Sequence, residues 1–314
     1  MLRRAGHSLG SRLCQRQGQL EPAVQGLKPS FAVAEEAVEG ARDASTLLVK
    51  QRMKSVANIG KITKAMKMVA ASKMRSAQVN TMNSRGIAEP LLKLLGDLPD
   101  AQGKKNVYVP ITSDKGLCGG INTTVCKYTR ASIKAEDGED KEHSIVVLGE
   151  KGRSQLQRDL RASIHSTVAD TGKVRVTFAQ AAAIADGINT TEFDVARLIF
   201  NRFHSAISYK PTIATSLEKE AEAGGLLDQY EIEGPDRAEL LQNLSEFNLA
   251  STLYNALMEN NCSEQASRMA AMESSTKNAE EMLGKLTLTY NRTRQATITT
   301  ELIEIISGAT ALAG

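Results

Sequence analysis

Apolar residues recur every three or four positions near both ends of the chain, and this spacing predicts two long helices. In the amino-terminal stretch the stripe consists of Val49, Met53, Val56, Ile59, Ile62, Met66 and Val69. In the carboxyl-terminal stretch it consists of Met269, Met272, Thr276, Ala279, Leu283, Leu286 and Tyr290, and then, after a phase slip near Arg294, of Ile298, Leu302, Ile305, Ala309 and Leu312. Residues 30–89 and 236–314 contain no proline, the residue that most reliably breaks a helix. We therefore expect helices over about 45–85 and about 245–313.

These two helices are too long for the rest of the chain to cover. At 1.5 Å per residue they measure roughly 60 Å and roughly 100 Å. We expect them to pack on each other as a long antiparallel two-helix coiled coil that projects beyond the domain between them. The alternative is that each stretch breaks into two or three helices of a bundle. The scarcity of internal glycines, which are Gly60, Gly86, Gly284 and Gly308, weakens that alternative.

The middle of the chain alternates short β-rich runs with helical segments. Strands are expected at 107–112, 144–148, 195–200 and 212–215, helices at 121–134, 153–160 and 178–186, and a late edge strand at 230–233. This alternation predicts a mostly parallel sheet with helices on its faces, so the fold class is α/β. The expected divisions are a leader over 1–43, helical segments over 44–95 and 236–314, and an α/β domain over 96–235.

The amino end has the pattern of an organelle presequence. Arg3, Arg4, Arg12 and Arg16 all precede the first acidic residue, Glu21, and no long apolar segment accompanies them. The alternative is a disordered basic tail. The charge reverses in the acidic segment 35–43, which is either the end of the leader or an extension, so we place processing between residues 29 and 44.

Composition argues against several functional classes. The 314 residues carry a net charge of +3, are 41% hydrophobic and lack Trp, and no apolar run reaches the roughly 18 residues of a membrane-spanning helix. The four cysteines and four histidines lie in no metal-ligand spacing, so no metal site, disulfide framework or catalytic residue is predicted. The Gly-rich segment 113–120 follows a strand and precedes a helix, where phosphates are often bound. Its spacing fits neither a Walker loop nor a dinucleotide fingerprint, which favours a tight turn and no bound cofactor.

Two surfaces indicate protein partners. Residues 44–88 contain no acid but nine basic residues: Lys50, Arg52, Lys54, Lys61, Lys64, Lys67, Lys73, Arg75 and Arg85. The carboxylates of the returning helix can balance part of this charge, including Glu264, Glu273, Glu280 and Glu281. The excess predicts an acidic protein surface as partner, because no nucleic-acid-binding motif accompanies the charge. Residues 295–314 carry only two charges, Glu301 and Glu304, so this apolar end must be covered by another chain.

Four segments, in order, resemble the γ subunit of F-type ATP synthases. They are the carboxyl-terminal signature at 298–311 (ITTELIEIISGATA), the shaft motif at 62–74 (ITKAMKMVAASKM), the central loop at 113–120 (SDKGLCGG) and the segment 290–296 (YNRTRQA). These matches span about 44–313. By this resemblance the chain is identified as a member of that family.

The resemblance implies a fold and a function. The terminal helices would form an asymmetric coiled coil inside the hexameric ring of α and β subunits of F1. A Rossmann-like middle domain would lie against the small central-stalk subunits, of δ or ε type, and the c-ring. Such a rotor couples c-ring rotation to conformational cycling of the catalytic β subunits and hydrolyses nothing itself. Two other classes remain on the residues alone: a nucleotide-binding enzyme and a basic-helix nucleic-acid binder.

The resemblance also assigns partner-binding residues. Arg294 and Gln295 match a family pair that hydrogen-bonds a β-subunit loop; the alternative is that they are only polar groups on a helix surface. Met66, with Lys64 and Lys67, matches the shaft level that faces an acidic loop of β. The apolar tip, including Ile298, Leu302 and Ile305, suits a bearing, because hydrophobic contact is non-directional.

The resemblance and the presequence together indicate a mitochondrial protein. Chloroplast members carry a closely spaced cysteine pair in the middle domain, whereas residues 217–233 contain no cysteine. We therefore expect the mitochondrial form, peripheral to the matrix side of the inner membrane.

Overall fold

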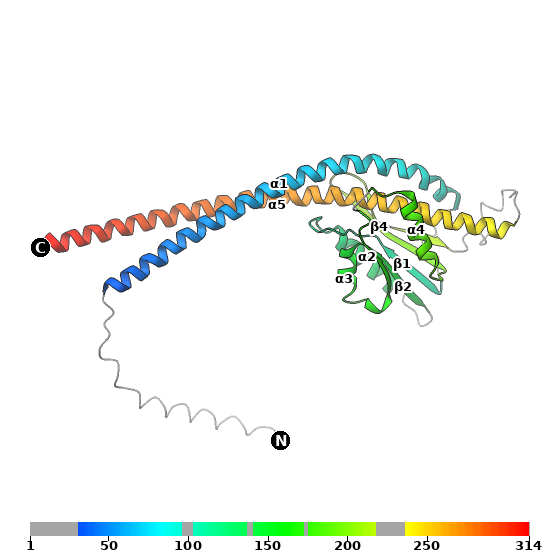
Figure 1. Cartoon of the computed structure of the whole chain (residues 1–314), viewed down its shortest axis with the longest axis horizontal. Coiled ribbons are helices and arrows are strands. Elements are labelled where there is room, and N and C mark those ends of the chain that lie inside the picture. Colours follow the sequence, from blue (N-terminus) through cyan, green and yellow to red (C-terminus); the bar gives the residue numbers. More distant parts are fainter. Residues whose placement is uncertain (1–30, 96–102, 137–140, 173–174, 218–235, 314) are drawn as a thin grey trace, which may run out of the picture. The chain divides into compact units, whose positions relative to one another are not determined.

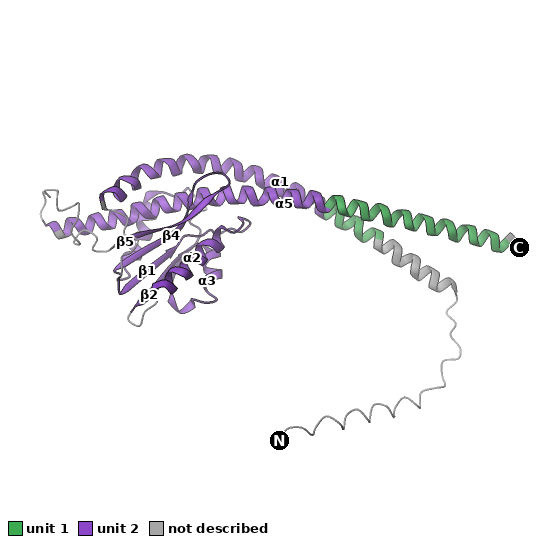
Figure 2. Cartoon of the chain, turned by 180° about the vertical axis from the view of Figure 1, so that it is seen from behind, with its two compact units in different colours: residues 1–55, 283–314 green, residues 56–282 purple. Residues whose placement is uncertain are grey.

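The computed structural model describes residues 31–95, 103–136, 141–172, 175–217 and 236–313. Contacts divide the chain into two compact units, one of residues 1–55 with 283–314 and one of residues 56–282 (Figure 2). Most of the predicted presequence, residues 1–30, and the predicted edge strand at 230–233 lie outside the described residues.

The elements alternate between two terminal helices as the sequence predicts. In chain order they are α1 (Phe31–Leu95), β1 (Lys105–Pro110), α2 (Ile121–Glu136), β2 (Glu142–Leu148), α3 (Glu150–Leu156), the short helix η1 (Arg161–Ser163), β3 (Ile164–Val168), α4 (Phe178–Asn189), β4 (Val195–Phe203), β5 (Tyr209–Leu217) and α5 (Arg237–Ala313).

The sheet lies in the 56–282 unit and has the strand order β3-β2-β1-β4-β5, of which Figure 1 labels β2, β1 and β4. The first four strands are parallel, while β5 pairs antiparallel with β4. The order 3-2-1-4-5 is that of a doubly wound, Rossmann-type sheet. The predicted α/β class with a mostly parallel sheet is therefore confirmed.

Alternating strand residues build a core on each face of the sheet. On one face, Val109, Leu198 and Phe200 belong to a buried cluster with Ile188 of α4 and Leu253 of α5. On the other face, Tyr108, Ile145 and Ile199 cluster with Val125 of α2 and Leu156 of α3. Because successive strand residues point to opposite faces, the apolar runs of β1, β2 and β4 bury both faces at once.

Some element boundaries differ from the expectation. The helix α1 begins at residue 31, before the expected start near 45, and continues through Pro90 to Leu95. Pro90 lies within the last two turns of α1, where the loss of one backbone hydrogen bond to residue 86 is tolerated. The expected helix at 153–160 is instead α3 at 150–156, and the strand β3 at 164–168 was not predicted.

Within the 56–282 unit, α1 and α5 pair antiparallel, as predicted. Thr63 hydrogen-bonds Thr276 (Oγ1–Oγ1 2.8 Å), Thr81 Oγ1 donates to the Met258 carbonyl (3.1 Å), and Ser84 Oγ donates to Asn255 Oδ1 (3.0 Å). As the residue number rises along α1 it falls by the same amount along α5. This is the register of an antiparallel helix pair.

The predicted contact stripe on α1 was partly wrong. Ile59, Ile62 and Val69 are 51%, 58% and 56% exposed instead of facing α5. The buried positions of α1 are instead occupied by small residues, spaced three, four or seven positions apart. They are Thr63, Ala70, Ala77, Thr81, Ser84 and Ala88. Small side chains allow close approach of the helices: a Cβ added at Gly60 would lie 3.6 Å from Ala279 Cβ.

The other unit contains only helical segments among its described residues. Val49 and Met53 of α1, and Leu283, Leu286 and Tyr290 of α5, are half-buried. Every residue from 301 to 312 is exposed. The apolar stripe therefore loses its cover toward the carboxyl end.

Candidate functional site

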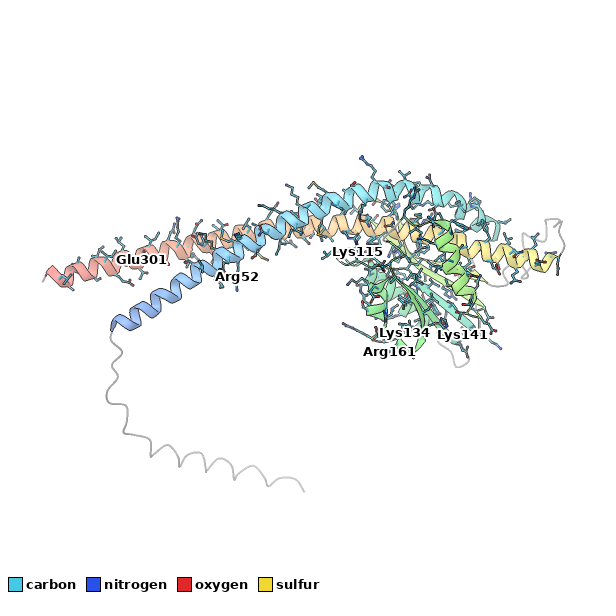
Figure 3. All side chains as sticks on the ribbon, viewed as in Figure 1. Arg52, Lys115, Lys134, Lys141, Arg161 and Glu301 are labelled. Atoms are coloured by element: carbon cyan, nitrogen blue, oxygen red, sulfur yellow. The ribbon has the colours of Figure 1, made fainter. Side chains whose placement is uncertain are left out.

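The carboxyl-terminal part of α5 is an uncovered apolar surface. Ile298, Leu302 and Ile305 are 54%, 55% and 68% exposed, and Ile303 and Ile306 on other sides of the helix are 57% and 54% exposed. Figure 3 shows side chains standing out from the helix on both sides of Glu301. We define residues 298–312 as the apolar tip. Exposed apolar surface of this extent marks an interaction site or an aggregation hazard.

Threonine hydroxyls on this part of α5 are used within the helix itself. Each hydroxyl donates a hydrogen bond to the backbone carbonyl of the residue four positions earlier. The threonines that do so are Thr287, Thr289, Thr293, Thr297, Thr299, Thr300 and Thr310. A back-bonded hydroxyl is already satisfied as a donor. The tip therefore presents mainly methyl groups and few directional polar groups.

Arg294 and Gln295 lie just before the apolar tip and are both exposed. Neither side chain has a hydrogen bond or ion pair to any described residue. Their charge and amide group are thus available for a partner, and they lie next to each other on one turn of α5.

Lys64, Met66 and Lys67 occupy different environments on α1 in the 56–282 unit. Lys64 is exposed and has no ion pair among the described residues, whereas Met66 is half-buried. Lys67 Nζ lies 3.3 Å from Glu273 Oε1 of α5. The structure therefore brings these predicted residues to one level of the helix pair but engages Lys67 within the pair.

Most of the positive charge of α1 remains unpaired. Among the nine basic residues at 50–85, Lys67 pairs with Glu273 and Arg85 pairs with Glu259, which leaves seven with no ion pair to a described residue. Of the four acids expected to balance this charge, only Glu273 pairs with α1, and Glu264 pairs with Arg268 on its own helix. The excess positive charge is consequently exposed.

A second patch on α1 was missed in the sequence. Ile59, Ile62, Met68 and Val69 are exposed apolar residues on the same stretch as the unpaired lysines. The small residues of α1 recur at intervals of three and four positions, and this spacing identifies the side of the helix that is buried. The isoleucines lie off that side, so the spacing would have predicted that they are exposed.

The Gly-rich segment 113–120 forms a connection between the sheet and α5. Asn122 Oδ1 accepts from the Ser113 amide (3.0 Å), and Asn122 Nδ2 donates to Ser113 Oγ (2.8 Å). Ser267 Oγ of α5 donates to the Cys118 carbonyl (2.6 Å), and Gly119 has a φ of 63°. Nearby, burial raises the pKa of Glu264. These contacts account for the segment as a tight turn docked on α5.

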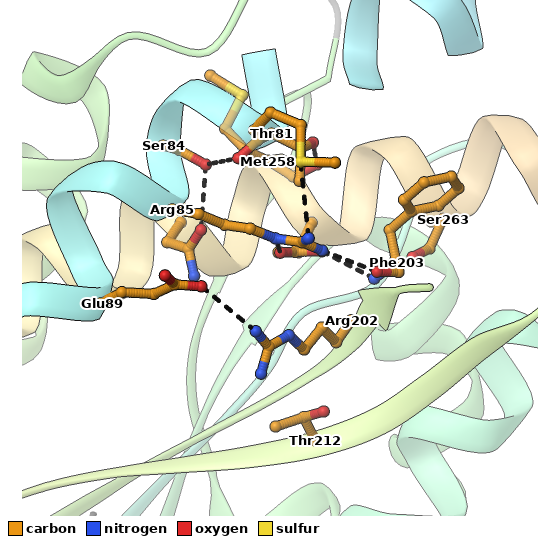
Figure 4. A network of polar contacts seen from close by, with 12 residues as sticks. Thr81, Ser84, Arg85, Glu89, Arg202, Phe203, Thr212, Met258 and Ser263 are labelled. Carbon is orange, nitrogen blue, oxygen red and sulfur yellow. Dashed lines mark hydrogen bonds and ion pairs between the residues drawn. The ribbon is translucent and has the colours of Figure 1, made fainter. Parts of the chain in front are cut away.

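An ion pair that sequence reasoning missed joins α1, α5 and the sheet (Figure 4). Glu259 of α5 is fully buried and accepts from Arg85 Nη2 (3.1 Å) and from the Phe203 amide (2.7 Å). Arg85 Nη2 also donates to the Phe203 carbonyl (2.8 Å). The hydrogen bond to Glu259 is the main cause of the raised pKa of Arg85. We call these three residues the clamp.

No helix in the described part of the chain is both long and apolar enough to cross a membrane. The surfaces described above, an apolar helix end and unpaired cations on a long helix, define the class of chains that work by binding other chains.

Comparison with known proteins identifies the family. Residues 45–312 match the family described as ATP synthase. The mitochondrial ATP synthase subunit gamma of Ipomoea batatas is 53% identical over 287 residues, covering 88% of each chain. The corresponding protein of Arabidopsis thaliana is 52% identical and covers 90% of each chain. The rat mitochondrial F(1) complex subunit gamma is 42% identical, covering 84% of this chain and 98% of the rat protein.

Solved structures agree. A chain of the Tetrahymena thermophila mitochondrial ATP synthase central stalk/c-ring structure is 33% identical, with a TM-score of 0.57, and covers 68% of this chain and 98% of that one. A chain of the Euglena gracilis mitochondrial enzyme shares the fold, with a TM-score of 0.74 at 24% identity, covering 86% and 95%. The chain belongs to the ATP synthase gamma subunit family, which confirms the predicted resemblance.

Proposed function

We propose that this chain is the central-stalk rotor subunit of the F1 sector of a mitochondrial proton-driven ATP synthase. In this role it couples rotation of the c-ring to conformational cycling of the catalytic β subunits and has no active site of its own. The observation that carries the proposal is the apolar tip, because an exposed apolar helix end of this kind needs a sleeve provided by other chains.

The partners follow from the surfaces and from the names of similar proteins. We assign the α and β subunits to the terminal helices, and the small central-stalk subunits and the c-ring to the α/β domain. The similar chains from Euglena and Tetrahymena belong to structures of F1 with the c-ring and of the central stalk with the c-ring, which supports this assignment. The plant and rat relatives are named as mitochondrial, which supports a location on the matrix side of the inner membrane.

The apolar tip is suited to a bearing. Contact through methyl groups has no preferred direction, and the back-bonded threonines leave few hydrogen bonds to break as the tip turns. Ile298, Leu302 and Ile305 would therefore slide against an apolar sleeve. Arg294 and Gln295, which are exposed just before the tip, would form the polar contact with a β-subunit loop.

The shaft level at Lys64 and Met66 is suited to an acidic partner. Lys64 supplies an unpaired charge, while Lys67 shares its charge with Glu273 and contributes less. Unpaired cations accelerate association with an acidic surface and orient the encounter. The exposed Ile62 and Val69 would add apolar contact beside that charge.

The domain organisation belongs to the same proposal. Residues 44–95 and 236–314 would be the shaft helices, residues 96–235 the domain that contacts the stalk subunits, and residues 1–43 a leader of which at least part is removed. The mass of the chain isolated from mitochondria measures how much is removed.

Co-purification tests the proposal. A tagged full chain is co-expressed with the α and β subunits of its own organism, and α and β are expected to co-purify as an assembly with ATP hydrolysis activity. A Leu302→Asp, Ile305→Asp variant is expected to reduce the yield several-fold, because the sleeve would have to bury two unpaired charges. Tyr128→Asp, at an exposed position of α2, is the matched control. If wild-type chain recovers neither α nor β, the proposal is wrong.

A further inference from the structure

A cleft beside the clamp is lined almost entirely by basic residues. It has a volume of about 260 Å³ and is lined by Arg85 of α1 and by Arg202, Phe203, His204 and Lys210 of the β4–β5 hairpin. We call it the hairpin cleft. It lies wholly within the 56–282 unit, and none of the roles proposed above uses it.

Two of these basic residues are held opposite each other across the strands. Arg202 of β4 and Lys210 of β5 are direct partners in the antiparallel register, so their side chains project from the same face of the sheet. Directly opposed side chains have Cβ atoms about 5 Å apart, and like charges in this position destabilise the sheet. Repulsion between Arg202 and Lys210 therefore destabilises the hairpin, and an anion bound between the two side chains would reduce that repulsion.

The acids near the cleft cancel only part of its charge. Glu259 is buried and balances Arg85, and its oxygens are occupied by Arg85 and the Phe203 amide. Glu89 lies 3.7 Å from Arg202 in an ion pair whose two side chains are about half exposed, so the attraction is weak (Figure 4). Lys210 and His204 are exposed and have no ion pair to a residue in the described part of the chain.

We propose that the hairpin cleft binds a phosphate group. Guanidinium groups present several N–H donors in a planar fork that matches the oxygens of phosphate, and Lys210 adds a mobile point charge. The cleft is smaller than the roughly 300–1,000 Å³ of pockets that enclose a whole small molecule. A single phosphate group fits this size, either as the free ion or as the headgroup of an anionic phospholipid.

Bound phosphate would join the α1 helix to the edge of the sheet. Arg85 comes from α1, whereas Arg202, His204 and Lys210 come from the hairpin. Nε and Nη2 of Arg85 already donate to Glu259 and to the Phe203 carbonyl, so an anion in the cleft would reach α1 through Arg85 Nη1, which otherwise lies 3.7 Å from Met82 Sδ. The expected consequence is a more stable fold in phosphate than in chloride at the same ionic strength.

Titration of the full chain with inorganic phosphate tests the proposal. Calorimetry at constant low ionic strength is expected to show one site, and thermal unfolding is expected to shift upward with phosphate. Lys210→Gln should weaken phosphate binding at least fivefold. Without phosphate it should leave the melting temperature unchanged or raise it, because the opposed charge is gone. Lys127→Gln, at an exposed position of α2, is the matched control and should change neither quantity.

A second arm separates the two sources of phosphate. Vesicles of neutral phospholipid, with and without an anionic phospholipid, are floated with wild-type chain and with Lys210→Gln. If wild-type chain floats with the vesicles only when they contain the anionic lipid, and Lys210→Gln floats less, the ligand is a lipid headgroup. If calorimetry shows phosphate binding but the chain does not float with anionic vesicles, the ligand is the free ion. The proposal is wrong if neither form binds, if Lys210→Gln binds as wild type does, or if only an acidic peptide binds. Each of these results leaves co-purification with α and β unaffected.

Discussion

At the level of single residues, the clamp decides how the long helices are fixed to the sheet. Glu259 is an acid with no exposed surface, and such a group is tolerated only when its oxygens are paired. Arg85 and the Phe203 amide provide that pairing from two other elements. Removing either partner therefore leaves a buried carboxylate without compensation.

We expect Arg85→Leu to destabilise the chain by about 3 kcal/mol, the typical cost of breaking a buried ion pair. Arg153→Ala is the control, because Arg153 forms an exposed pair with Glu150 (Nη1–Oε2 3.7 Å) that contributes under about 1 kcal/mol. Urea unfolding followed by circular dichroism measures both changes. Equal urea midpoints for the two variants would show that the clamp does not stabilise the fold.

The buried thiols give a prediction that depends on pH. Burial raises the pKa of Cys126 and of Cys262 to about 11. The folded state thus keeps the proton up to higher pH than the unfolded chain does, and at pH 8 its thiolate fraction is roughly a hundredfold smaller.

Alkylation of the full chain at pH 8 is therefore expected to label these two thiols at least a hundredfold more slowly in buffer than in denaturing urea. Peptide mass mapping separates the two sites from Cys14 and Cys118. As pH rises from 9 to 11 the native rate should increase. Rapid native labelling of Cys262 at pH 8 would mean that the helix pair opens at that level.

At the level of elements, the sequence predicted the existence of both helices better than the side by which they pair. On α5 the apolar stripe around Met272 and Ala279 is the buried one. On α1 the large residues Ile59 and Ile62 point outward. Hydrophobicity alone assigns the largest side chains to the contact, whereas close packing of two helices selects small ones such as Ala70.

In the sheet, the sequence pattern predicts the central strands but not the edge strand β3. The runs at β1, β2 and β4 are predictable because residues such as Val109 and Leu198 are buried on one face while their neighbours are buried on the other. The strand β3, with sequence IHSTV, has a weak signal: it lies at an edge and its residues are half-buried or exposed. Edge strands depend on pairing that the sequence pattern does not reveal.

The close helix contact at Gly60 gives a paired prediction. Gly60→Ala is expected to stabilise the chain by up to about 1 kcal/mol, because alanine favours the helix and its Cβ would lie 3.6 Å from Ala279 Cβ, an ordinary contact. Gly60→Leu is expected to destabilise it by about 1–3 kcal/mol, because the larger side chain forces the helices apart. Thermal unfolding followed at 222 nm measures both. Similar effects of the two substitutions would contradict the close contact.

For the whole molecule, the surfaces that bear on function are those whose apolar or charged side chains have no partner within the described residues. The apolar tip and seven unpaired basic residues on α1 stabilise nothing that is visible within the described residues. Sequence reasoning found the tip and the charge because a run with only two acids and a run with no acids are visible as composition. It missed the clamp and the hairpin cleft, because Arg85, the hairpin that carries Arg202 and Lys210, and Glu259 are far apart in the chain and meet only through the fold.

The proposed polar contact near the tip can be tested in the assembled complex. Arg294 and Gln295 are exposed and make no side-chain hydrogen bond to a described residue, so replacing both by alanine should leave the isolated chain folded with an unchanged melting temperature. Loss of hydrogen bonds to a β-subunit loop should lower ATP turnover of the complex several-fold. Arg292→Ala, at an exposed position on the same helix, is the control. Turnover that equals wild type in the double variant would assign Arg294 and Gln295 to an ordinary helix surface and leave the apolar tip as the only contact proposed for this end of α5.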